Sequence, residues 1–287
     1  MEKTTKKKWS KKKKVWVIIL CIVAFLFVSV LTAGAVVLHM YCKTAEYNIV
    51  ETSQDVNLIA HRGYRAVAPE NTAAAFEEAG KAGFTATECD VYRTKDGVWV
   101  VSHDRTTYRM MDKSEFVEKI TFDEFQAMNV VNGSNIENYP NLKVCTLEDY
   151  LKICKEYGMR AVIELKGPNN TEHYDEIIEL IDKYDSDCMF ISFHLDNLKA
   201  IRELSDAPVW FLVKKIDDEA IENALTLGGK CGIDFDYKKE ENNAETIQKC
   251  IDKGLEVGAW TVNDEESMNR LLDLGVKNIT TDCIVPE

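Results

Sequence analysis

The sequence predicts an α/β protein, a (β/α)8 TIM barrel with an N-terminal transmembrane helix. Strand-like and helix-like patterns alternate from residue 57 to 281, and a right-handed series of eight βα units closes a parallel sheet into a barrel. The roughly 240 residues from Tyr47 onward are the usual size of one such barrel. We therefore expect a basic tail over 1–14, a transmembrane helix over 15–40, a tether over 41–56 and a barrel over 57–287.

The amino terminus has the pattern of a membrane anchor. Residues 1–14 carry eight lysines and one glutamate, and Val15 to Leu38 are 24 residues without a charge. At about 1.5 Å per residue, a helix of that length crosses a bilayer core of roughly 30 Å. The lysines predict a single-pass protein of the cell membrane with a cytoplasmic amino terminus and an extracellular domain. A signal peptide cleaved near Ala33-Gly34-Ala35 is the alternative, but signal peptides usually have apolar regions of only about 7 to 15 residues.

The charge of the remaining chain excludes some partners. The whole sequence has 35 basic and 48 acidic residues, of which eight and one lie in residues 1–14, so 27 and 47 remain and the net charge there is −20. An acidic surface of this kind argues against nucleic acid and against tight docking on anionic lipid head groups.

The cysteines indicate packing rather than cross-links. Seven of the nine follow residue 43, and they form no CxxC pair. Several lie in apolar or strand-like stretches, so we expect buried thiols and neither a disulfide framework nor a zinc site. Free thiols are unusual outside the cell, and this leaves a cytoplasmic barrel as a second possible topology.

The first polar cluster follows a short apolar strand. Leu58 to Ala60 leads directly to His61 and Arg62, where the backbone must turn at Gly63. Pro69-Glu70-Asn71-Thr72 then precedes a helix predicted over 73–82, with Asn71 or Thr72 as its cap.

The next two strands bring carboxylates and a second histidine. Ala86 to Tyr92 places Glu88 and Asp90 on one face, and the repulsion between them is explained if they bind a cation. Val98 to Ser102 ends at His103. The turn before Val98 is too short for a parallel crossover, so this run is predicted to return antiparallel. Together with the six strands predicted further along the chain, the sequence has nine candidate strands. Setting this antiparallel run aside leaves eight for the barrel.

The stretch from Arg105 to Lys143 is irregular apart from a helical pattern over 121–128. Loops of this length in a compact barrel usually carry function. We therefore expect this segment to contribute to function.

Regular alternation resumes with a helix capped by Thr146 and a strand over 160–166. On that strand Glu164 and Lys166 share a face, and such a pair is costly inside a barrel unless it binds something. The later helices are predicted over 174–184, 195–204, 218–227, 244–253 and 265–274, and the strands that follow them over 188–193, 209–213, 232–236, 257–262 and 278–281.

The order and spacing of these motifs resemble the glycerophosphodiester phosphodiesterase family. The matching motifs are His61-Arg62-Gly63, Pro69-Glu70-Asn71-Thr72, Glu88-x-Asp90, His103-Asp104, Glu164-Leu165-Lys166, Ser192-Phe193, Trp260-Thr261-Val262-Asn263 and Thr281-Asp282. The resemblance covers about residues 57 to 283. It implies a metal-dependent hydrolase that converts glycerophosphodiesters to an alcohol and glycerol phosphate. In that family the adjacent glycerol hydroxyl is thought to attack phosphorus before water completes the hydrolysis.

The resemblance and the residue chemistry together imply roles for the metal ligands and the histidines. Hard oxygen ligands would hold one divalent cation, Mg²⁺ or Ca²⁺. The expected metal ligands are Glu88, Asp90 and Glu164. The expected acid and base are His61 and His103, in either order, because an imidazole pKa near 6.5 suits both tasks.

The same resemblance implies how the substrate is bound. Arg62 and Lys166 are expected at the phosphate, and Trp260 with Phe193 at the alcohol or glycerol group. We expect small soluble glycerophosphodiesters to be the main substrates.

Two other functions fit the same residues. A phospholipase D-like or C-like enzyme would act on lysophospholipids, and Phe116, Phe122 and Phe125 in the irregular segment favour an apolar mouth of that kind. A non-catalytic binding barrel at the membrane is the other alternative.

Overall fold

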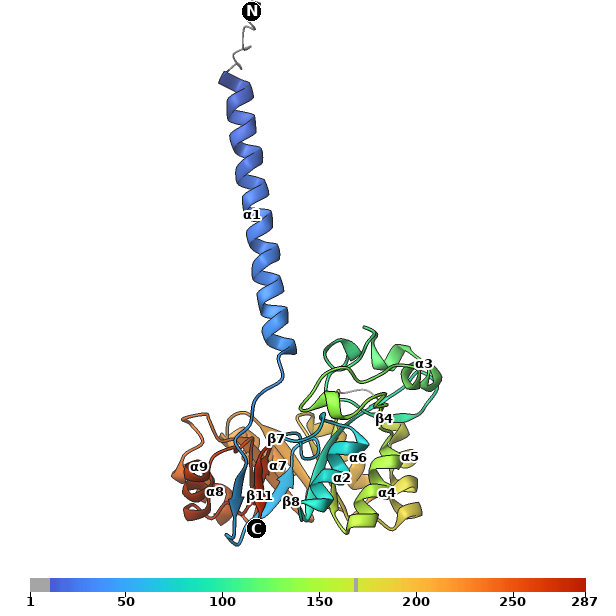
Figure 1. The fold of residues 1–287 in the computed structure, drawn as a ribbon. Helices are drawn as coiled ribbons and strands as arrows, with labels where there is room; N and C mark the ends of the chain where they lie inside the picture. Colours follow the sequence, from blue (N-terminus) through green and yellow to red (C-terminus); the bar gives the residue numbers. More distant parts are fainter. Residues whose placement is uncertain (1–10, 168–169) are drawn as a thin grey trace, which may run out of the picture. The chain divides into compact units, whose positions relative to one another are not determined.

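The computed structural model describes residues 11–167 and 170–287. These form two compact units, which divide between Lys43 and Thr44. The first ten residues of the predicted basic tail lie outside the described residues. In the first unit, α1 (Lys11–Cys42) is one continuous helix (Figure 1).

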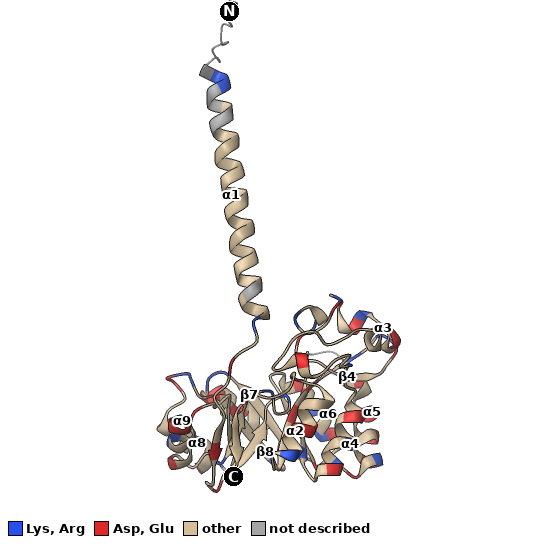
Figure 2. Cartoon of the chain, viewed as in Figure 1, with Lys and Arg blue, Asp and Glu red and all other residues tan. Residues whose placement is uncertain are grey.

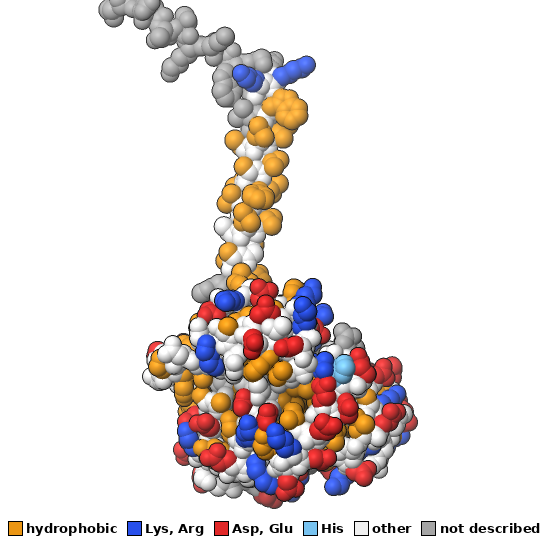
Figure 3. Space-filling model, turned by 90° about the vertical axis from the view of Figure 1, so that its right-hand side faces the viewer, with side chains coloured by type: hydrophobic (Ala, Val, Ile, Leu, Met, Phe, Trp, Pro, Cys, Tyr) orange, Lys and Arg blue, Asp and Glu red, His pale blue; other side chains and the backbone are white. Residues whose placement is uncertain are grey.

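Helix α1 contains a segment long and apolar enough to cross a membrane. Ile19–Cys42 has a mean hydropathy of 2.7 over its apolar window, and none of that window is buried. Twenty-four residues at about 1.5 Å each give roughly 36 Å of helix. Figure 2 shows lysine in the first turn of α1, and Figure 3 shows apolar side chains along it. A membrane span and a signal sequence both fit this helix.

The second unit is the predicted TIM barrel. Eight parallel strands pair in the order β2-β10-β9-β8-β7-β6-β5-β3, and β2 pairs with β3 to close the ring. Helices surround the strands (Figure 1). The barrel strands are β2 (Asn57–Ala60), β3 (Ala86–Arg93), β5 (Arg160–Leu165), β6 (Cys188–Ser192), β7 (Val209–Val213), β8 (Cys231–Asp236), β9 (Glu256–Trp260) and β10 (Asn278–Thr281).

The hairpin predicted from the short turn is present. β4 (Trp99–Val101) pairs antiparallel with β3, with Val91 opposite Val101. It therefore lies outside the ring of eight and returns His103 toward the end of the barrel that carries Asp90.

The helices begin at the capping residues that the sequence indicates. Thr72 accepts a hydrogen bond from the Ala75 amide, and Thr146 forms a capping box with Asp149. The helices of this unit are α2 (Ala73–Lys81), α3 (Phe122–Gln126), α4 (Leu147–Tyr157), α5 (Tyr174–Tyr184), α6 (Leu195–Leu204), α7 (Asp218–Leu225), α8 (Ala244–Asp252) and α9 (Glu265–Asp273).

Apolar side chains fill part of the interior of the ring. Ile59, Val162, Met189 and Trp210 are buried in one cluster there. The Trp210 ring occupies space that a side chain on β9 would need, since a Cβ at Gly258 would lie 2.7 Å from it. The larger part of the core lies between the strands and the helices.

The irregular segment forms a small layer with its own apolar core. It contains α3 and the short 3-10 turns η1 (Thr107–Arg109), η2 (Val117–Lys119) and η3 (Ile136–Asn138). Phe125 is fully buried, and Phe122 packs against the same cluster, whereas Phe116 is 45% exposed. Two of the three phenylalanines therefore stabilise the segment instead of forming an apolar mouth.

A second, two-stranded sheet was not predicted. β1 (Val50–Thr52) pairs in parallel with β11 (Ile284–Pro286). The range 41–56, which we expected to be a tether, thus contains a strand, and the second compact unit includes the chain from Thr44 onward.

The seven cysteines after residue 43 are all buried free thiols. This agrees with the packing role predicted for them, and it adds no metal ligand to the carboxylates of the barrel.

Candidate active site

The polar cluster begins where β2 ends. His61, Arg62 and Gly63 follow the strand directly, and Arg62 and Gly63 have left-handed backbone angles, with φ of 58° and 80°. A Cβ at Gly63 would lie 2.6 Å from the Ala75 backbone, so only glycine fits this close approach to α2. The turn directs the Arg62 amide at Glu88, whose Oε2 accepts its hydrogen bond at 2.9 Å.

Three carboxylates meet on adjacent strands. Glu88 and Asp90 come from β3, and Glu164 is the register partner of Asp90 on β5. One oxygen from each lies within 4.8 Å of the others. Glu88 and Asp90 are 2% and 1% exposed, and Glu88 Oε1 has no hydrogen-bond partner among the described residues.

Burial and neighbouring charges shift the pKa values of the three carboxylates. Burial, followed by the charges of Asp90 and Glu164, raises the pKa of Glu88 well above its ordinary value. Burial and Asp90 raise the pKa of Glu164 to about 7. Burial alone would raise the pKa of Asp90, but the charges of Lys166, His103 and Arg62 hold it well below its usual range.

Lys166 offsets part of this negative charge. Its Nζ lies 2.8 Å from Glu164 Oε1 and 3.2 Å from Asp90 Oδ1. Burial alone would lower the pKa of Lys166, but those two carboxylates raise it. In the described part of the chain, Glu88 has no cationic side chain at such a distance.

The three carboxylates fit a divalent cation. They supply hard oxygen donors, which Mg²⁺ and Ca²⁺ prefer, and one of them, Glu88, has a buried oxygen without a hydrogen-bond partner among the described residues. A divalent cation would remove the repulsion that raises the pKa of Glu88 and Glu164.

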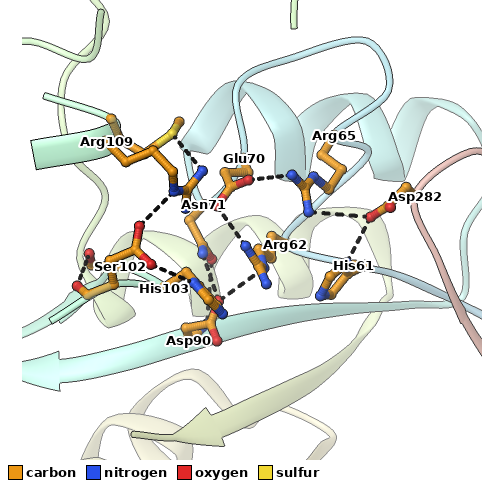
Figure 4. Close-up of polar contacts among 12 residues, drawn as sticks. His61, Arg62, Arg65, Glu70, Asn71, Asp90, Ser102, His103, Arg109 and Asp282 are labelled. Carbon is orange, nitrogen blue, oxygen red and sulfur yellow. Dashed lines mark hydrogen bonds and ion pairs between the residues drawn. The ribbon is translucent and has the colours of Figure 1, made fainter. Parts of the chain in front are cut away.

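A carboxylate orients the first histidine (Figure 4). His61 Nδ1 lies 2.7 Å from Asp282 Oδ1, and Asn263 Nδ2 donates to Asp282 Oδ2 at 2.8 Å. Burial lowers the pKa of His61, Arg62 lowers it further, and Asp282 acts in the opposite direction. Burial alone would raise the pKa of Asp282, but His61 and Arg65 bring it to about 2. With an ionised Asp282 accepting from Nδ1, His61 keeps the lone pair on Nε2.

The second histidine also has a carboxylate partner, and an arginine of the irregular segment holds that carboxylate. His103 Nδ1 lies 2.9 Å from Asp104 Oδ1, and Arg109 Nε donates to Asp104 Oδ2 at 2.6 Å. Burial alone would raise the pKa of Asp104, but the hydrogen bond from His103 and the charge of Arg109 lower it to about 2. The Asp104 carboxylate therefore stays anionic and holds the imidazole.

Glu70 links the residues around His61 to those around His103. Its carboxylate accepts from Arg62 at 2.8 Å and from Arg109 at 2.5 Å through Oε1, and from Arg65 at 2.6 Å through Oε2. Figure 4 shows the three guanidinium groups around it. Removing Glu70 would leave three largely buried cations without a shared partner, so we infer that it positions them.

A cavity of about 130 Å³ opens beside these groups. The rings of Phe193 and Trp260 meet edge to face at its wall, with centroids 5.7 Å apart. Burial, followed by the charge of Glu164, raises the pKa of Asp234 to about 8. The full lining consists of His61, Arg62, Glu88, His103, Glu164, Lys166, Ile191, Phe193, Leu212, Asp234, Trp260, Thr261 and Thr280.

The structure thus brings together the residues that the sequence singled out. Of the nine side chains expected to bind the metal, the phosphate or the organic groups or to act as acid and base, eight line the cavity, and the ninth, Asp90, is buried next to them and accepts a hydrogen bond from Asn71. Four further acids of the site were assigned no role from the sequence, although Glu70, Asp104 and Asp282 lie in the motifs that carry the resemblance. The inward-facing position of Asp234 on an apolar strand was a usable signal, since Glu164 was identified in that way. The four acids are Asp282, Asp104, Glu70 and Asp234.

Paired histidines with anionic partners, cationic groups and a carboxylate cluster suited to a divalent cation can bind a phosphate and move protons on both sides of it. On a TIM barrel, with these groups at the carboxyl ends of strands, this chemistry is that of a phosphodiester hydrolase.

The chain belongs to the glycerophosphoryl diester phosphodiesterase family, whose model matches residues 61–285. The glycerophosphodiester phosphodiesterase 1 of Mus musculus is 26% identical over 254 residues, covering 77% of this chain and 76% of its own. The glycerophosphodiester phosphodiesterase of Bacillus subtilis (strain 168) is 29% identical over 248 residues, covering 78% of this chain and 82% of its own.

A solved phosphodiesterase structure is also similar to this chain. An Oleispira antarctica phosphodiesterase in complex with the product sn-glycerol-3-phosphate has a TM-score of 0.73 and 26% identity, over 79% of this chain and 92% of its own. The chain is thus a hydrolase that cleaves glycerophosphodiesters to an alcohol and glycerol phosphate, and this activity depends on a divalent metal.

Proposed function

We propose that Glu88, Asp90 and Glu164 bind one divalent cation, either Mg²⁺ or Ca²⁺. The observation that carries this proposal is the convergence of three carboxylates within 4.8 Å in a buried site where Glu88 Oε1 has no partner among the described residues. A bound cation would offset negative charge on the phosphate as the reaction proceeds. All the donors are oxygens, which disfavours softer metals.

Arg62 and Lys166 are the proposed phosphate ligands. Both line the cavity, and both are held in place by carboxylates, Arg62 by Glu70 and Lys166 by Glu164. Charged donors fixed in this way need little reorganisation when a phosphate arrives.

His61 is the proposed general base and His103 the proposed general acid. The lowered pKa of His61 keeps it neutral at pH 7, and its Nδ1 is engaged by Asp282, so Nε2 is the atom that accepts a proton. In Figure 4 the two histidines lie on either side of Arg62, one of the proposed phosphate ligands. The base takes the proton of the attacking hydroxyl, and the acid gives one to the leaving oxygen.

The proposed substrates are small soluble glycerophosphodiesters such as glycerophosphoethanolamine and glycerophosphoglycerol. The cavity of about 130 Å³ suits a glycerol-sized group beside Trp260 and Phe193. The net charge of −20 after residue 14 opposes approach to a dense anionic surface. Glycerol phosphate polymers of the cell envelope are a secondary substrate class.

Lysophospholipid hydrolysis is the alternative function. Its support in the sequence was the apolar segment beside the mouth, but Phe125 is fully buried and Phe122 packs in the same cluster. The remaining support is the exposed ring of Phe116.

The proposed location is the cell membrane. Helix α1 would be a single uncleaved span, with the amino terminus in the cytoplasm and the barrel outside, because lysines precede the apolar segment. In this arrangement residues 1–14 form the basic tail.

The test uses the full chain in detergent with a panel of diesters. We expect glycerol phosphate and free alcohol to be released with Mg²⁺ or Ca²⁺, and no release after chelation. Release of phosphocholine or phosphoethanolamine instead would contradict the assignment of the scissile bond. Turnover that persists in excess chelator would contradict the metal site.

A further inference from the structure

Asp234 is an acid on the mainly apolar side of the cavity, where Thr261 and Thr280 are the other polar lining residues. It lies on β8, is 3% exposed and lines the cavity, and its Oδ1 has no hydrogen-bond partner among the described residues. A buried carboxyl oxygen without a hydrogen-bond partner is costly to keep. Its position is therefore informative about what the cavity binds.

The space around this carboxyl is tight. A Cβ at Gly258 would lie 3.0 Å from Asp234 Oδ1 and 2.7 Å from the Trp210 ring. The absence of a side chain at Gly258 therefore accommodates both groups. Asp234 pairs in register with Leu212 on one side and Gly258 on the other, and neither offers a side-chain donor.

The cavity has two chemically distinct arcs. The charged groups other than Asp234 come from, or follow, β2, β3, β4 and β5. The uncharged lining residues come from, or directly follow, β6, β7, β9 and β10, and they are Ile191, Phe193, Leu212, Trp260, Thr261 and Thr280. In the closed order of eight strands, β8 lies four places from β3 and is thus across the barrel from Glu88. A substrate whose phosphate is bound at the charged arc would have one of its two organic groups on the side of Asp234.

We propose that Asp234 is a specificity-determining residue that hydrogen-bonds the terminal hydroxyl of the substrate's glycerol group. This inference rests on the proposed function, in which the phosphate lies at the charged arc. Glycerol is the part common to every substrate of this activity, so a fixed and buried polar group suits the glycerol better than it suits the variable alcohol.

A hydroxyl matches this site in either protonation state of the carboxyl. It donates to an ionised Asp234, and it both donates to and accepts from a protonated one. An ammonium group would need an ionised acid and further acceptors, but most of the nearby arc is apolar. An acylated terminal oxygen has no proton to donate and would bring a long chain into a cavity of about 130 Å³. Asp234 therefore selects deacylated substrates.

The test compares substrates that differ in one hydroxyl. Glycerophosphoethanolamine is measured against 2-hydroxypropyl phosphoethanolamine, which keeps the hydroxyl beside the phosphodiester and lacks the terminal one. The ethyl ester of glycerol phosphate, which has no ammonium group, is the third substrate. We expect the native enzyme to prefer the glycerol substrates in kcat/KM by about 10²-fold or more, since sites built to bond a hydroxyl reject analogues without it.

Two substitutions separate hydrogen bonding from charge. Asp234→Leu should remove the preference by lowering kcat/KM for both glycerol substrates while leaving the deoxy substrate within about threefold. Asp234→Asn keeps a donor and an acceptor and should retain most of the preference. Asp236→Asn, on the same strand but outside the cavity lining, is the matched control. It should leave kcat/KM unchanged for the glycerol substrates and for the deoxy substrate. Asp234→Leu should also raise Tm, because it removes a buried carboxyl whose Oδ1 has no hydrogen-bond partner among the described residues.

Three results would overturn the inference. One is that the native enzyme does not prefer the glycerol substrates to the deoxy substrate, or that this preference is retained in Asp234→Leu. Another is an equal loss on all substrates with a lower Tm, which would assign Asp234 to barrel packing. The third is a loss confined to glycerophosphoethanolamine and equal in the Asn and Leu variants, which would show an ammonium site instead. If the native enzyme hydrolyses none of the three substrates with either metal, the proposed function fails as well, so the two failures are distinguishable.

Discussion

His61 Nδ1 lies 2.7 Å from Asp282 Oδ1, although the two residues are 221 positions apart in the sequence. The contact joins the end of the first barrel strand to the residue that follows the last one. Closure of the barrel between β2 and β10 is what brings them together. The carboxylate fixes the imidazole so that Nε2 is left for proton transfer.

Asp282→Asn should lower kcat by about 10²-fold or more, because the imidazole loses its orientation. The Asp282 carboxylate raises the pKa of His61, so its loss should lower that pKa further. A general base must be unprotonated, and therefore the rising limb of kcat/KM against pH should move to lower pH. Asp273→Asn, at an exposed position, is the control and should leave the pH profile unchanged. If the rising limb of kcat/KM in Asp282→Asn lies at the same pH as in the native enzyme, His61 is not the general base.

Loss of either histidine should be severe. His61→Ala and His103→Ala should each lower kcat by about 10² to 10⁴, the range for losing a general acid or base. The measurement is steady-state kinetics on glycerophosphoethanolamine, with circular dichroism to confirm folding. His173→Ala, outside the cavity lining, is the control. A folded variant with native kcat would refute the role of the histidine it lacks.

Glu164→Gln should abolish activity and leave the barrel folded, because it removes one of the three converging carboxylates. Native protein should gain Tm on addition of Mg²⁺ or Ca²⁺, since a ligand that binds only the folded state stabilises it. The variant should gain much less. Glu256→Gln, an exposed residue on β9, is the control. Equal Tm gains in Glu164→Gln and native protein would place the cation elsewhere.

Topology can be tested by protease added to intact cells. If α1 is an uncleaved span with the barrel outside, the protease should remove the barrel and leave a small membrane-bound fragment. The lysines before the apolar segment motivate this expectation. Protection that disappears on cell lysis would place the barrel in the cytoplasm, and release of an intact barrel without protease would indicate a cleaved signal sequence.

The barrel was predictable because its signals are local. Each βα unit has its own apolar run, cap and turn, and the length of the turn before Val98 was enough to predict that β4 is antiparallel. β1 and β11 were missed because each is three residues long and their pairing joins the two ends of the unit. No local pattern marks such a contact.

The site was predictable only in part, for a related reason. Glu88 and Glu164 stand out because they interrupt apolar strands. Asp282, Asp104 and Glu70 follow ordinary turn patterns, and their role arises from contacts with residues of other elements. Tertiary proximity gives these residues their function, so a single sequence identifies them only through resemblance.

Substrate preference provides the last prediction. The cavity of about 130 Å³ leaves little space for an acyl chain, and two of the three phenylalanines of the irregular segment are committed to packing. We therefore expect kcat/KM for glycerophosphoethanolamine to exceed that for the matching lysophospholipid by at least about tenfold at fixed Mg²⁺ or Ca²⁺, the scale of discrimination expected from a pocket that lacks space for extra methylenes. Both substrates should be compared below the critical micelle concentration, so that surface dilution does not mimic selectivity. Phe116→Ser is the informative variant, because Phe116 is the exposed phenylalanine of the segment. If native protein prefers the lysolipid and Phe116→Ser loses that preference, the enzyme acts on lysophospholipids through this segment.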